Sequence, residues 1–374
     1  MILNYPNKTP EAELLRSCSK VCPSTQFYPS EKLLLQGDNF DIMKFLLENG
    51  YAGKIDLVYI DPPFATNNIF TIGDNRVSTI SRSKKDKTAY TDHLTGVDFI
   101  EFLRKRLVLL RELMSENGSI YLHIDYKIGH YVKIIMDEVF GIKNFRNDIT
   151  RIKCNPKNFS RNAYGNIKDM ILFYSKSSTP IWNDPRESLE EDEVSARFKK
   201  VNADGRLYTT VPLHAPGETK NGPTGSMWRG MYPPEGRHWR SSPDELDRLD
   251  AEGLIEWSKT GNPRRIIFAD EKASLGKKMQ DVWTFKDSPY PKYPTEKNLS
   301  LLESIINSSS RKDSIVLDCF CGSGTTLVAA EKLGRKWIGI DQSDEAIRIC
   351  DIRLSEQMDI FTTAYRKFEF IEKN

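Results

Sequence analysis

Short apolar runs that stop abruptly at Asp, Gly or Pro alternate with helical periodicity along most of this chain, and few folds accommodate that alternation. The expected strands are 31–36, 54–60, 119–125, 169–174, 314–318 and 336–341, and the expected helices are 39–49, 99–115, 131–140, 301–307 and 325–333. Strands that alternate with helices are typical of βαβ units, in which neighbouring strands run parallel. We therefore predict an α/β fold with one mostly parallel sheet.

A change of composition interrupts this pattern between residues 180 and 288. The stretch is rich in Gly, Pro and charge, and it holds five of the six tryptophans, namely Trp182, Trp228, Trp239, Trp257 and Trp283. Because the burial of large aromatic side chains drives packing, we expect a folded insertion of short strands and loops with the tryptophans in its own small core. The acidic run 190–193 is expected to be a solvated loop. The chain thus divides into segments 30–179, 180–288 and 289–360.

The charge balance excludes little, because 54 Lys and Arg against 52 Asp and Glu give a net charge of only +2 over 374 residues. It argues against a uniformly basic nucleic-acid binder, but the distribution of charge matters more than its sum. Residues 143–176 alone hold eight Lys or Arg against two Asp. Six cysteines without zinc spacing, no signal peptide and no apolar run of membrane length predict a soluble, cytoplasmic protein with reduced thiols and no metal.

A glycine-rich turn follows the strand expected at 314–318, with the sequence Asp318-Cys319-Phe320-Cys321-Gly322-Ser323-Gly324-Thr325-Thr326. Glycine lets the backbone approach a ligand closely. Asp341, at the end of the next strand, is placed like the acid that binds ribose hydroxyls in nucleotide-binding folds. The spacing is not G-x-G-x-x-G, and no Lys follows the loop as in a P-loop. On these residues alone, a nucleoside site and a tight turn without a ligand both remain open.

The tetrad Asp61-Pro62-Pro63-Phe64 ends the apolar strand expected at 54–60. Its two prolines remove N–H donors and fix φ, so the Asp61 carboxylate and the Pro62 carbonyl are presented as acceptors beside an aromatic ring. Two acceptors suit an amine attached to an aromatic ring, because they hold both N–H groups and direct the lone pair outward. They also stabilise the positive charge that develops on nitrogen during alkyl transfer. The alternative is a proline-rich strand exit whose Asp caps a helix.

Together, the two motifs resemble those of the S-adenosylmethionine-dependent DNA amino-methyltransferases, which methylate the exocyclic amine of adenine or cytosine. The tetrad precedes the glycine loop, as in the permuted β group of that family. The resemblance implies a doubly wound, Rossmann-like methyltransferase sheet, with 30–179 as the catalytic half, 180–288 as an inserted target-recognition module and 289–360 as the cofactor-binding half. It also implies S-adenosylmethionine as the cofactor and double-stranded DNA as the partner.

The same resemblance assigns roles to individual residues. The implied catalytic residues are Asp61, Pro62, Pro63 and Phe64. The implied cofactor-binding residues are Asp38, Thr295, Lys297, Asp318, Phe320, Gly322, Ser323, Gly324, Thr325 and Asp341. Asn298 departs from the family, which often has Pro after this lysine. His123 and Asp125 share one face of a strand, and we expect a structural role for them because methyl transfer needs no metal.

The target amine of a paired base lies inside the duplex, so the base must be flipped out, and the protein must hold the phosphate backbone while this happens. Candidates near the catalytic loop and in the basic stretch are Lys84, Lys85, Lys87, Arg151, Lys153, Lys157 and Arg161. Candidates in the insertion are Arg229, Arg237 and Arg240. The competing interpretation is that some of these cations lie in solvated loops.

A leading Asp in the tetrad is, in this family, more usual for adenine than for cytosine. We therefore expect a site-specific adenine methyltransferase in restriction-modification or epigenetic marking, with cytosine-N4 methylation as the alternative. A nicotinamide-dependent oxidoreductase is disfavoured by the glycine spacing, and a non-catalytic DNA-recognition subunit by the intact tetrad. Further partners to consider are a cognate restriction endonuclease and a second copy of the chain; no membrane partner is expected.

Overall fold

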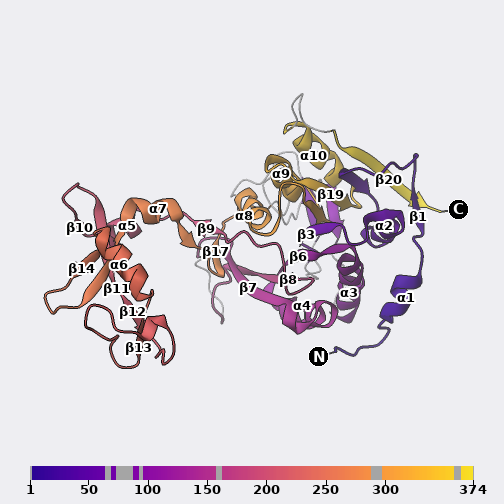
Figure 1. Ribbon diagram of the computed structural model, residues 1–374. Coiled ribbons are helices and arrows are strands. Elements are labelled where there is room, and N and C mark those ends of the chain that lie inside the picture. The colour runs from indigo at the N-terminus through magenta and orange to yellow at the C-terminus, as the bar shows by residue number, and fades with distance from the viewer. Residues whose placement is uncertain are drawn as a thin grey trace. The chain divides into compact units, whose positions relative to one another are not determined.

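The structure is a computed structural model that describes residues 2–63, 69–72, 87–91, 96–156, 162–287, 297–357 and 364–373, with the main chain only for 69–72 and 87–91. The chain forms two compact units (Figure 1). Unit 1 combines Met1–Asp184 with Gln280–Asn374, and unit 2 is Pro185–Met279. Each unit has sheets and buried side chains of its own.

Unit 1 is built on a ten-stranded sheet with the order β1-β20-β2-β19-β18-β3-β6-β8-β7-β17. In that order the strands are β1 (Val21–Pro23), β20 (Arg366–Glu372), β2 (Lys32–Gln36), β19 (Lys336–Asp341), β18 (Ile315–Asp318), β3 (Ile55–Ile60), β6 (Met114–Ile124), β8 (Lys168–Ser175), β7 (Phe145–Ile152) and β17 (Val282–Thr284). All neighbouring pairs from β20 to β6 are parallel. The predicted α/β fold with a mostly parallel sheet is confirmed. The periodicity did not indicate that β8 runs antiparallel between β6 and β7.

Helices cover both faces of this sheet, which is therefore doubly wound (Figure 1). One face carries α2 (Asn39–Leu46), α3 (Gly96–Leu113) and α4 (Tyr126–Phe140), and the other carries α8 (Leu299–Ser309), α9 (Thr325–Lys332) and α10 (Asp344–Ser355). The remaining elements of unit 1 are α1 (Glu11–Arg16), which packs on α3, the helical turns Leu47–Tyr51 and Ile142–Asn144, and an antiparallel pair β4 (Ile69–Ile72) and β5 (Lys87–Thr91). No helix in the described ranges is long and apolar enough to span a membrane.

The connections leave the middle of the sheet in opposite directions. From β3, the chain passes through α3 to β6 towards one edge, and from β18 it passes through α9 to β19 towards the other. The topological switch point of the sheet therefore lies between β18 and β3. In open α/β sheets, ligands bind outside the carboxyl ends of the strands at such a point.

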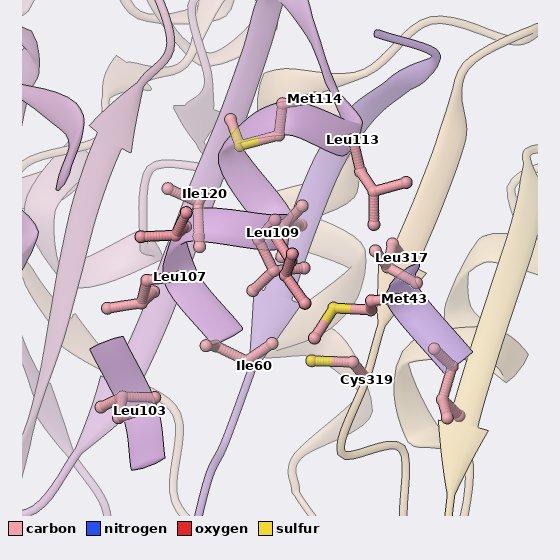
Figure 2. Packing of buried hydrophobic residues seen from close by; sticks show 14 of the residues in the cluster. Met43, Ile60, Leu103, Leu107, Leu109, Leu113, Met114, Ile120, Leu317 and Cys319 are labelled. Carbon is pink, nitrogen blue, oxygen red and sulfur yellow. The ribbon is translucent and has the colours of Figure 1, made fainter. Parts of the chain in front are cut away.

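The core of unit 1 fills the space between the sheet and the α2–α4 layer (Figure 2). Leu103 and Leu107, one helical turn apart on α3, are fully buried, as are Ile60 of β3, Ile120 of β6 and Leu317 of β18. Burying a side chain of this kind stabilises the fold by roughly 1.5–3 kcal/mol. The central strands read as near-continuous apolar runs because both of their faces are covered.

Unit 2 contains an antiparallel four-stranded sheet, β10-β11-β15-β14, and a two-stranded ribbon, β12–β13. Its elements are β9 (Arg186–Glu187), α5 (Glu191–Arg197), β10 (Lys200–Val201), β11 (Leu207–Pro212), β12 (His214–Pro216), the helical turn Pro223–Gly225, β13 (Arg237–Trp239), α6 (Pro243–Ala251), β14 (Ile255–Trp257), β15 (Pro263–Phe268), α7 (Ala269–Leu275) and β16 (Lys277–Lys278). The three helices were not predicted. The acidic run is also not a loop, since Glu190 and Glu193 form a capping box at the start of α5.

The expectation that all five tryptophans form the core of the insertion is wrong in part. Trp228 and Trp239 are buried in unit 2, and Trp257 stacks on Trp228 but stays exposed. Trp182 and Trp283 belong to unit 1, where Trp182 stacks on Phe173 and Trp283 is buried. Composition located the aromatic cluster but could not say which tryptophans pack against each other.

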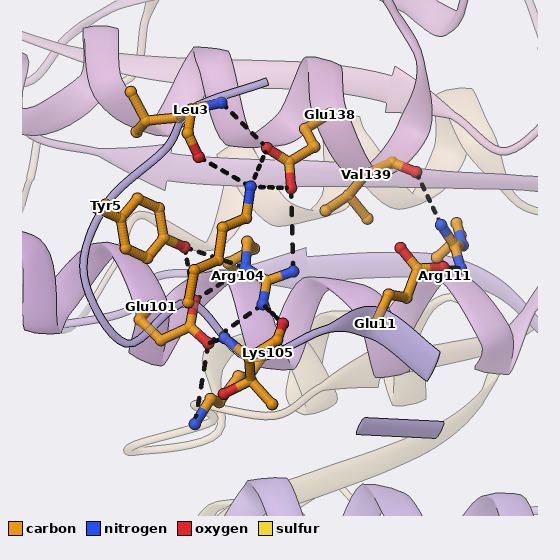
Figure 3. Close-up of polar contacts among 11 residues, drawn as sticks. Leu3, Tyr5, Glu11, Glu101, Arg104, Lys105, Arg111, Glu138 and Val139 are labelled. Carbon is orange, nitrogen blue, oxygen red and sulfur yellow. Dashed lines mark hydrogen bonds and ion pairs between the residues drawn. The ribbon is translucent and has the colours of Figure 1, made fainter. Parts of the chain in front are cut away.

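A polar network fastens the N-terminal arm to α3 and α4 (Figure 3). Glu101 of α3 accepts hydrogen bonds from the Tyr5 hydroxyl and the Thr9 amide, and it pairs with Arg104 at 2.9 Å. Glu138 of α4 pairs with Lys8 at 2.7 Å. Burial alone would raise the pKa of Glu101, but the hydrogen bonds from Arg104 and Tyr5 lower it to about 2. Glu101 is therefore ionised in the folded protein over the whole physiological range.

We predict that Glu101→Gln lowers the free energy of unfolding at pH 7. An acid whose pKa is lower in the folded than in the unfolded chain stabilises the fold above its unfolded pKa, and this contribution is lost as the pH falls. The difference between wild type and variant should therefore shrink between about pH 5 and pH 2, as measured by urea unfolding at several pH values. Glu13→Gln, the same change on an exposed side chain of α1, is the control. A difference that did not depend on pH would contradict this account of Glu101.

Candidate active site

The acids of both sequence motifs lie at the carboxyl ends of central strands of the unit 1 sheet. Leu317 is in register with Val58, so β18 and β3 end side by side, with Asp318 closing one strand and Asp61 following the other. Asp341 is in register with Gln36 at the end of β2, two residues before Asp38. Parallel strands thus bring together residues from both ends of the sequence at the switch point.

Of the two carboxylate oxygens of Asp61, one is paired and the other has no partner among the described residues. Lys297 donates to Oδ2 at 2.7 Å, and both side chains are largely shielded from solvent. Oδ1 is buried, and no hydrogen-bond donor reaches it from the part of the chain that the structure describes. Pro62 is buried behind it. An unsatisfied buried acceptor costs about 1–3 kcal/mol, so this atom marks a place where a donor from a ligand would be stabilising.

The glycine-rich loop is held in shape by Asp318. Its Oδ1 accepts a hydrogen bond from the Phe320 amide at 3.0 Å, and its Oδ2 accepts one from the Thr326 hydroxyl at 2.6 Å. Burial, with a smaller contribution from the nearby Asp61, raises the pKa of Asp318 to about 7 despite these bonds. Because both oxygens have partners within the loop, Asp318 fixes the conformation of the loop.

Arg353 and Asp341 hold the rest of the loop. Arg353 of α10 donates from Nη1 to the carbonyl and hydroxyl of Ser323 and to the Thr325 hydroxyl, at 2.9, 2.9 and 3.2 Å. Asp341 accepts from the amides of Gly322 and Ser343, both at 2.9 Å, which leaves each of its oxygens a further lone pair. Burial raises the pKa of Asp341, and these amides oppose the shift. Asp341 remains only partly buried.

A second group of residues surrounds Asp38 at the end of β2. Asp38 caps α2 by accepting from the amides of Phe40 and Asp41, and its other oxygen pairs with Arg106 at 3.0 Å. The Arg106 guanidinium lies 3.5 Å from the centre of the Phe102 ring, and that ring contacts Phe320, with ring centres 6.1 Å apart. Asp38 and Phe320 are therefore linked through Arg106 and Phe102. Arg106 and Phe102 also line a cavity of about 430 Å³. The other lining residues are Pro6, Asn7, Asp38, Phe40, Val97, Asp98, Glu101 and Lys105.

A buried polar chain begins at Tyr59, two residues before Asp61. The Tyr59 hydroxyl is 2.9 Å from His123 Nδ1, and His123 Nε2 is 3.2 Å from Asp169. The ionised Asp169 requires a proton on Nε2, so Nδ1 accepts from Tyr59. Burial lowers the pKa of His123, and the neighbouring Lys297 lowers it further. The expected structural role of His123 is consistent with these contacts, and Asp125 caps α4.

One predicted DNA contact is contradicted by burial. The Arg151 side chain is fully buried; its guanidinium pairs with Asp287, lies 3.7 Å from Asp169 and donates to the Phe285 carbonyl at 2.9 Å. A phosphate cannot reach it, and the correct assignment is a structural clamp between β7 and the segment after β17. A charge count along the sequence does not reveal such partners.

The other predicted DNA contacts differ in what the structure says of them. Lys153 is partly exposed and pairs with Asp169 at 2.6 Å. Arg229, Arg237 and Arg240 are all exposed, and Arg229 pairs with Asp250. The predicted residues Phe64, Lys84, Lys85, Lys157, Arg161 and Thr295 lie outside the described residues, and the side chain of Lys87 is not described.

Sequence reasoning missed several residues that organise the site. Arg353, Arg106 and Tyr59 belong to no motif, and their contacts become visible only when the helices and strands are assembled. A usable signal existed for Tyr59, a polar residue in an apolar strand two residues before Asp61. Asn298, the departure from the family pattern, is the N-cap of α8, where it accepts from the Leu301 amide.

We predict that Gly324→Ala destabilises the protein by about 1–3 kcal/mol more than Gly334→Ala. The two glycines flank α9 and have similar positive φ values, 76° and 67°, so the backbone strain of the substitution is matched. A Cβ on Gly324 would lie 2.3 Å from Cys350 Sγ, whereas a Cβ on Gly334 would meet no atom within 4 Å. Equal losses in chemical unfolding of the two variants would show that close packing of the loop on α10 is unimportant.

The chain matches a family model described as DNA methylase over residues 55–351. It is 39% identical over 354 residues to the type II methyltransferase M.EcaI of Enterobacter cloacae, covering 91% of this chain and 75% of that protein. It is 27% identical to the Mod subunit of the type III restriction-modification enzyme StyLTI of Salmonella typhimurium, covering 82% of this chain and 51% of the subunit. The chain thus spans about half the length of that relative.

Two solved structures are also similar. The M1.HpyAVI–SAM complex is 19% identical with a TM-score of 0.45, covering 86% of this chain and 98% of that one. The cytosine-N4-specific PvuII DNA methyltransferase is 16% identical with a TM-score of 0.46, covering 88% and 87%. Because these TM-scores are below 0.5, the assignment rests on the sequence matches. From the extent of those matches, the chain belongs to the DNA methylase family, the S-adenosylmethionine-dependent amino-methyltransferases of DNA.

Proposed function

We propose that this protein transfers a methyl group from S-adenosylmethionine to the N6 amine of a flipped adenine within a specific DNA sequence. The observation that carries the proposal is the buried, unpaired Oδ1 of Asp61, which follows the strand beside the glycine-rich loop. A site that only bound DNA would not need an unsatisfied acceptor there. The donor half and the acceptor half of the reaction then meet at the switch point of the sheet.

The exocyclic amine of a base is a poor nucleophile because its lone pair is delocalised into the ring. In the proposed complex, Asp61 Oδ1 accepts one N–H and the Pro62 carbonyl accepts the other, which directs the lone pair away from the ring system. S-adenosylmethionine supplies an electrophilic methyl group on a sulfonium sulfur. As the nitrogen gains the methyl group and becomes cationic, the Asp61 carboxylate stabilises the charge and can take the departing proton.

Lys297 fits this scheme as a positioning residue. Its ammonium group holds Oδ2, so that the rotation of the carboxylate is fixed and Oδ1 remains for the amine. The assignment changes the role expected from the sequence, in which Lys297 contacts the cofactor. Tyr59, which sits behind the same loop and bonds to His123, supports the strand end that carries Asp61.

The proposed cofactor site uses residues at the ends of β2, β18 and β19. Asp341 retains lone pairs for ribose hydroxyls, and the loop of Gly322, Ser323, Gly324 and Thr325 brings backbone close to the ligand. Phe320 offers an apolar surface, and the cavity at Asp38 has a volume in the range of small-molecule sites. Asp318 contributes by fixing the loop, and Thr295 remains a prediction.

The choice of adenine rests on the leading Asp of the tetrad, which in this family is more usual for adenine. Cytosine-N4 methylation is the alternative, because both amines pose the same chemical problem. The names of the relatives support a place in restriction-modification. A cognate endonuclease as the partner and a location in the cytoplasm remain predictions. A homodimer remains a prediction, as do the phosphate contacts of Lys84, Lys85, Lys87, Lys153, Lys157 and Arg161. Membership in a methyltransferase family speaks against the oxidoreductase alternative.

The product of the reaction tests the proposal. The protein is incubated with a labelled methyl donor and mixed-sequence duplex DNA, and the DNA is digested to nucleosides. We expect labelled N6-methyladenine from the wild type and none from Asp61→Ala, which should still bind the donor. N4-methylcytosine would show that the base assignment is wrong. Unlabelled DNA from a protein that binds both DNA and the donor would contradict the proposed function.

Lys297→Met tests the positioning role. We expect kcat to fall by roughly 10- to 100-fold, because a hydrogen bond to a charged group is worth about 1.5–3 kcal/mol. The Kd for S-adenosylmethionine should change by less than about twofold, and Lys297→Arg should recover part of kcat because it keeps the ion pair. A raised Kd for the donor with an unchanged kcat would instead support the cofactor contact expected from the sequence.

A further inference from the structure

Strands β12 and β13 pair antiparallel over three residues each and form a short two-stranded ribbon in unit 2 (Figure 1). Pro216 is in register with Arg237, and Gly217 donates to the Gly236 carbonyl at 2.9 Å just beyond the paired residues. A two-stranded β-ribbon is one of the two elements that fit the major groove of B-DNA, and that groove alone distinguishes all four base pairs.

A rigid core supports the ribbon from within unit 2. Trp239 of β13 is buried, packs edge-on against Trp228, and donates to the Ser226 carbonyl at 2.9 Å. Trp228 in turn donates to Asp247 of α6 at 2.8 Å. The tryptophans therefore hold the ribbon in place and are not available as stacking platforms for bases. A fixed scaffold of this kind reduces the entropy lost when side chains on it engage a ligand.

Cations gather on this ribbon and on the adjoining strand. Arg237 contacts His214 across the pair, with Nη1 3.1 Å from Nδ1, and Arg240 and Arg264 lie close by. Burial lowers the pKa of His214, and the field of the three arginines lowers it further. Positive charges held together without an anion repel each other, so a site of this composition is stabilised by an anionic or electron-rich partner.

Several arginines of unit 2 are neutralised by ion pairs within the unit, whereas those of the ribbon are not. Within the described residues, Arg206 pairs with Asp270 at 2.8 Å, Arg248 with Glu245 at 2.6 Å, and Arg229 with Asp250. In the same part of the chain, Arg237 and Arg240 form no ion pair, although both are exposed. Glu218 and Glu235, which flank the ribbon in sequence, do not pair with them either. Elsewhere in the described part of unit 2, Arg197 and Arg265 are also exposed and form no ion pair, so the ribbon is distinguished by where its arginines are held and not by unpaired charge alone.

The hydrogen bond that holds Arg240 uses only one of its guanidinium nitrogens. Its Nε donates to the Pro212 carbonyl at 3.2 Å, and neither terminal nitrogen has a hydrogen-bond or ion-pair partner among the described residues. Arg237 is fixed through Nη1 by His214, which leaves Nε and Nη2. A guanidinium with two donors to spare matches O6 and N7 of guanine, the commonest specific contact in the major groove. Arg264 differs, because Nε and Nη2 are both used by Thr210.

We propose that the β12–β13 ribbon is the base-reading element of this methyltransferase, and that Arg237 and Arg240 recognise guanines in the major groove of the target sequence. The inference rests on the proposed function, which supplies the DNA. It goes further by assigning specificity to two residues, and it removes Arg229 from the set of predicted DNA contacts because Asp250 neutralises that side chain.

The test uses the full chain and a randomised duplex library, methylated under single-turnover conditions and sequenced for the modified sites. The variants are Arg237→Ala, Arg240→Ala and Arg240→Lys, with Arg248→Ala as the matched control on a paired, exposed arginine. We expect each variant except the control to lose discrimination for guanine at one position by roughly 10- to 100-fold. Arg240→Lys is decisive, because lysine keeps the charge but lacks the bidentate fork.

Two outcomes would overturn the inference while leaving the proposed function intact. The first is a uniform loss of affinity in Arg240→Ala, with a reduced salt dependence of binding, that Arg240→Lys restores, because this describes a phosphate contact. The second is a site profile identical to that of the wild type in all variants. If the wild type itself methylated no DNA in the same assay, the proposed function would fail, and the ribbon would have no substrate to read.

Discussion

The parallel pairing of β18 with β3 is the constraint on which the active site depends. It places the end of the strand that carries Asp318 next to the end of the strand that leads to Asp61, although the two strands come from opposite ends of the chain. The connections from these strands leave in opposite directions. The space beyond their carboxyl ends therefore stays open for a ligand. Sheet topology, and not proximity in sequence, brings the two motifs together.

Around the carboxyl ends of these strands the protein buries polar groups, and most of them have hydrogen-bond partners within the protein. Asp318 and His123 are buried with partners on both sides, and the amides of the glycine-rich loop are bound by Asp318 and Asp341. Such networks are stable only when their members are paired. Among the described residues, Asp61 Oδ1, Ser119 Oγ and Arg151 Nη1 are buried without a hydrogen-bond partner. The Asp61 atom is informative because it lies at the switch point of the sheet, and violations of polar pairing concentrate at functional sites. The ion pair with Lys297 explains why only one of the two oxygens is open.

The fold and the motif positions could be predicted because they depend on local sequence. Apolar runs that end at Asp61 and Asp318 indicate buried parallel strands, and strand order then makes their ends converge. The contact between Lys297 and Asp61 could not be predicted, since no local pattern relates residues so far apart. The burial of Arg151 was missed for the same reason: its partners, Asp169 and Asp287, are brought to it by β8 and by the segment after β17. In the insertion, composition indicated a folded module, but weak periodicity concealed its three helices.

The central claim is that Asp61 Oδ1 receives the target amine while Lys297 holds Oδ2. The most direct measurement is a crystal structure of the protein with its target duplex and a non-reactive analogue of the methyl donor. The account predicts a flipped base whose exocyclic nitrogen lies about 2.7–3.2 Å from Oδ1, with the Lys297 contact to Oδ2 retained. A flipped base whose amine is held by other groups, with Oδ1 still unpaired, would contradict it.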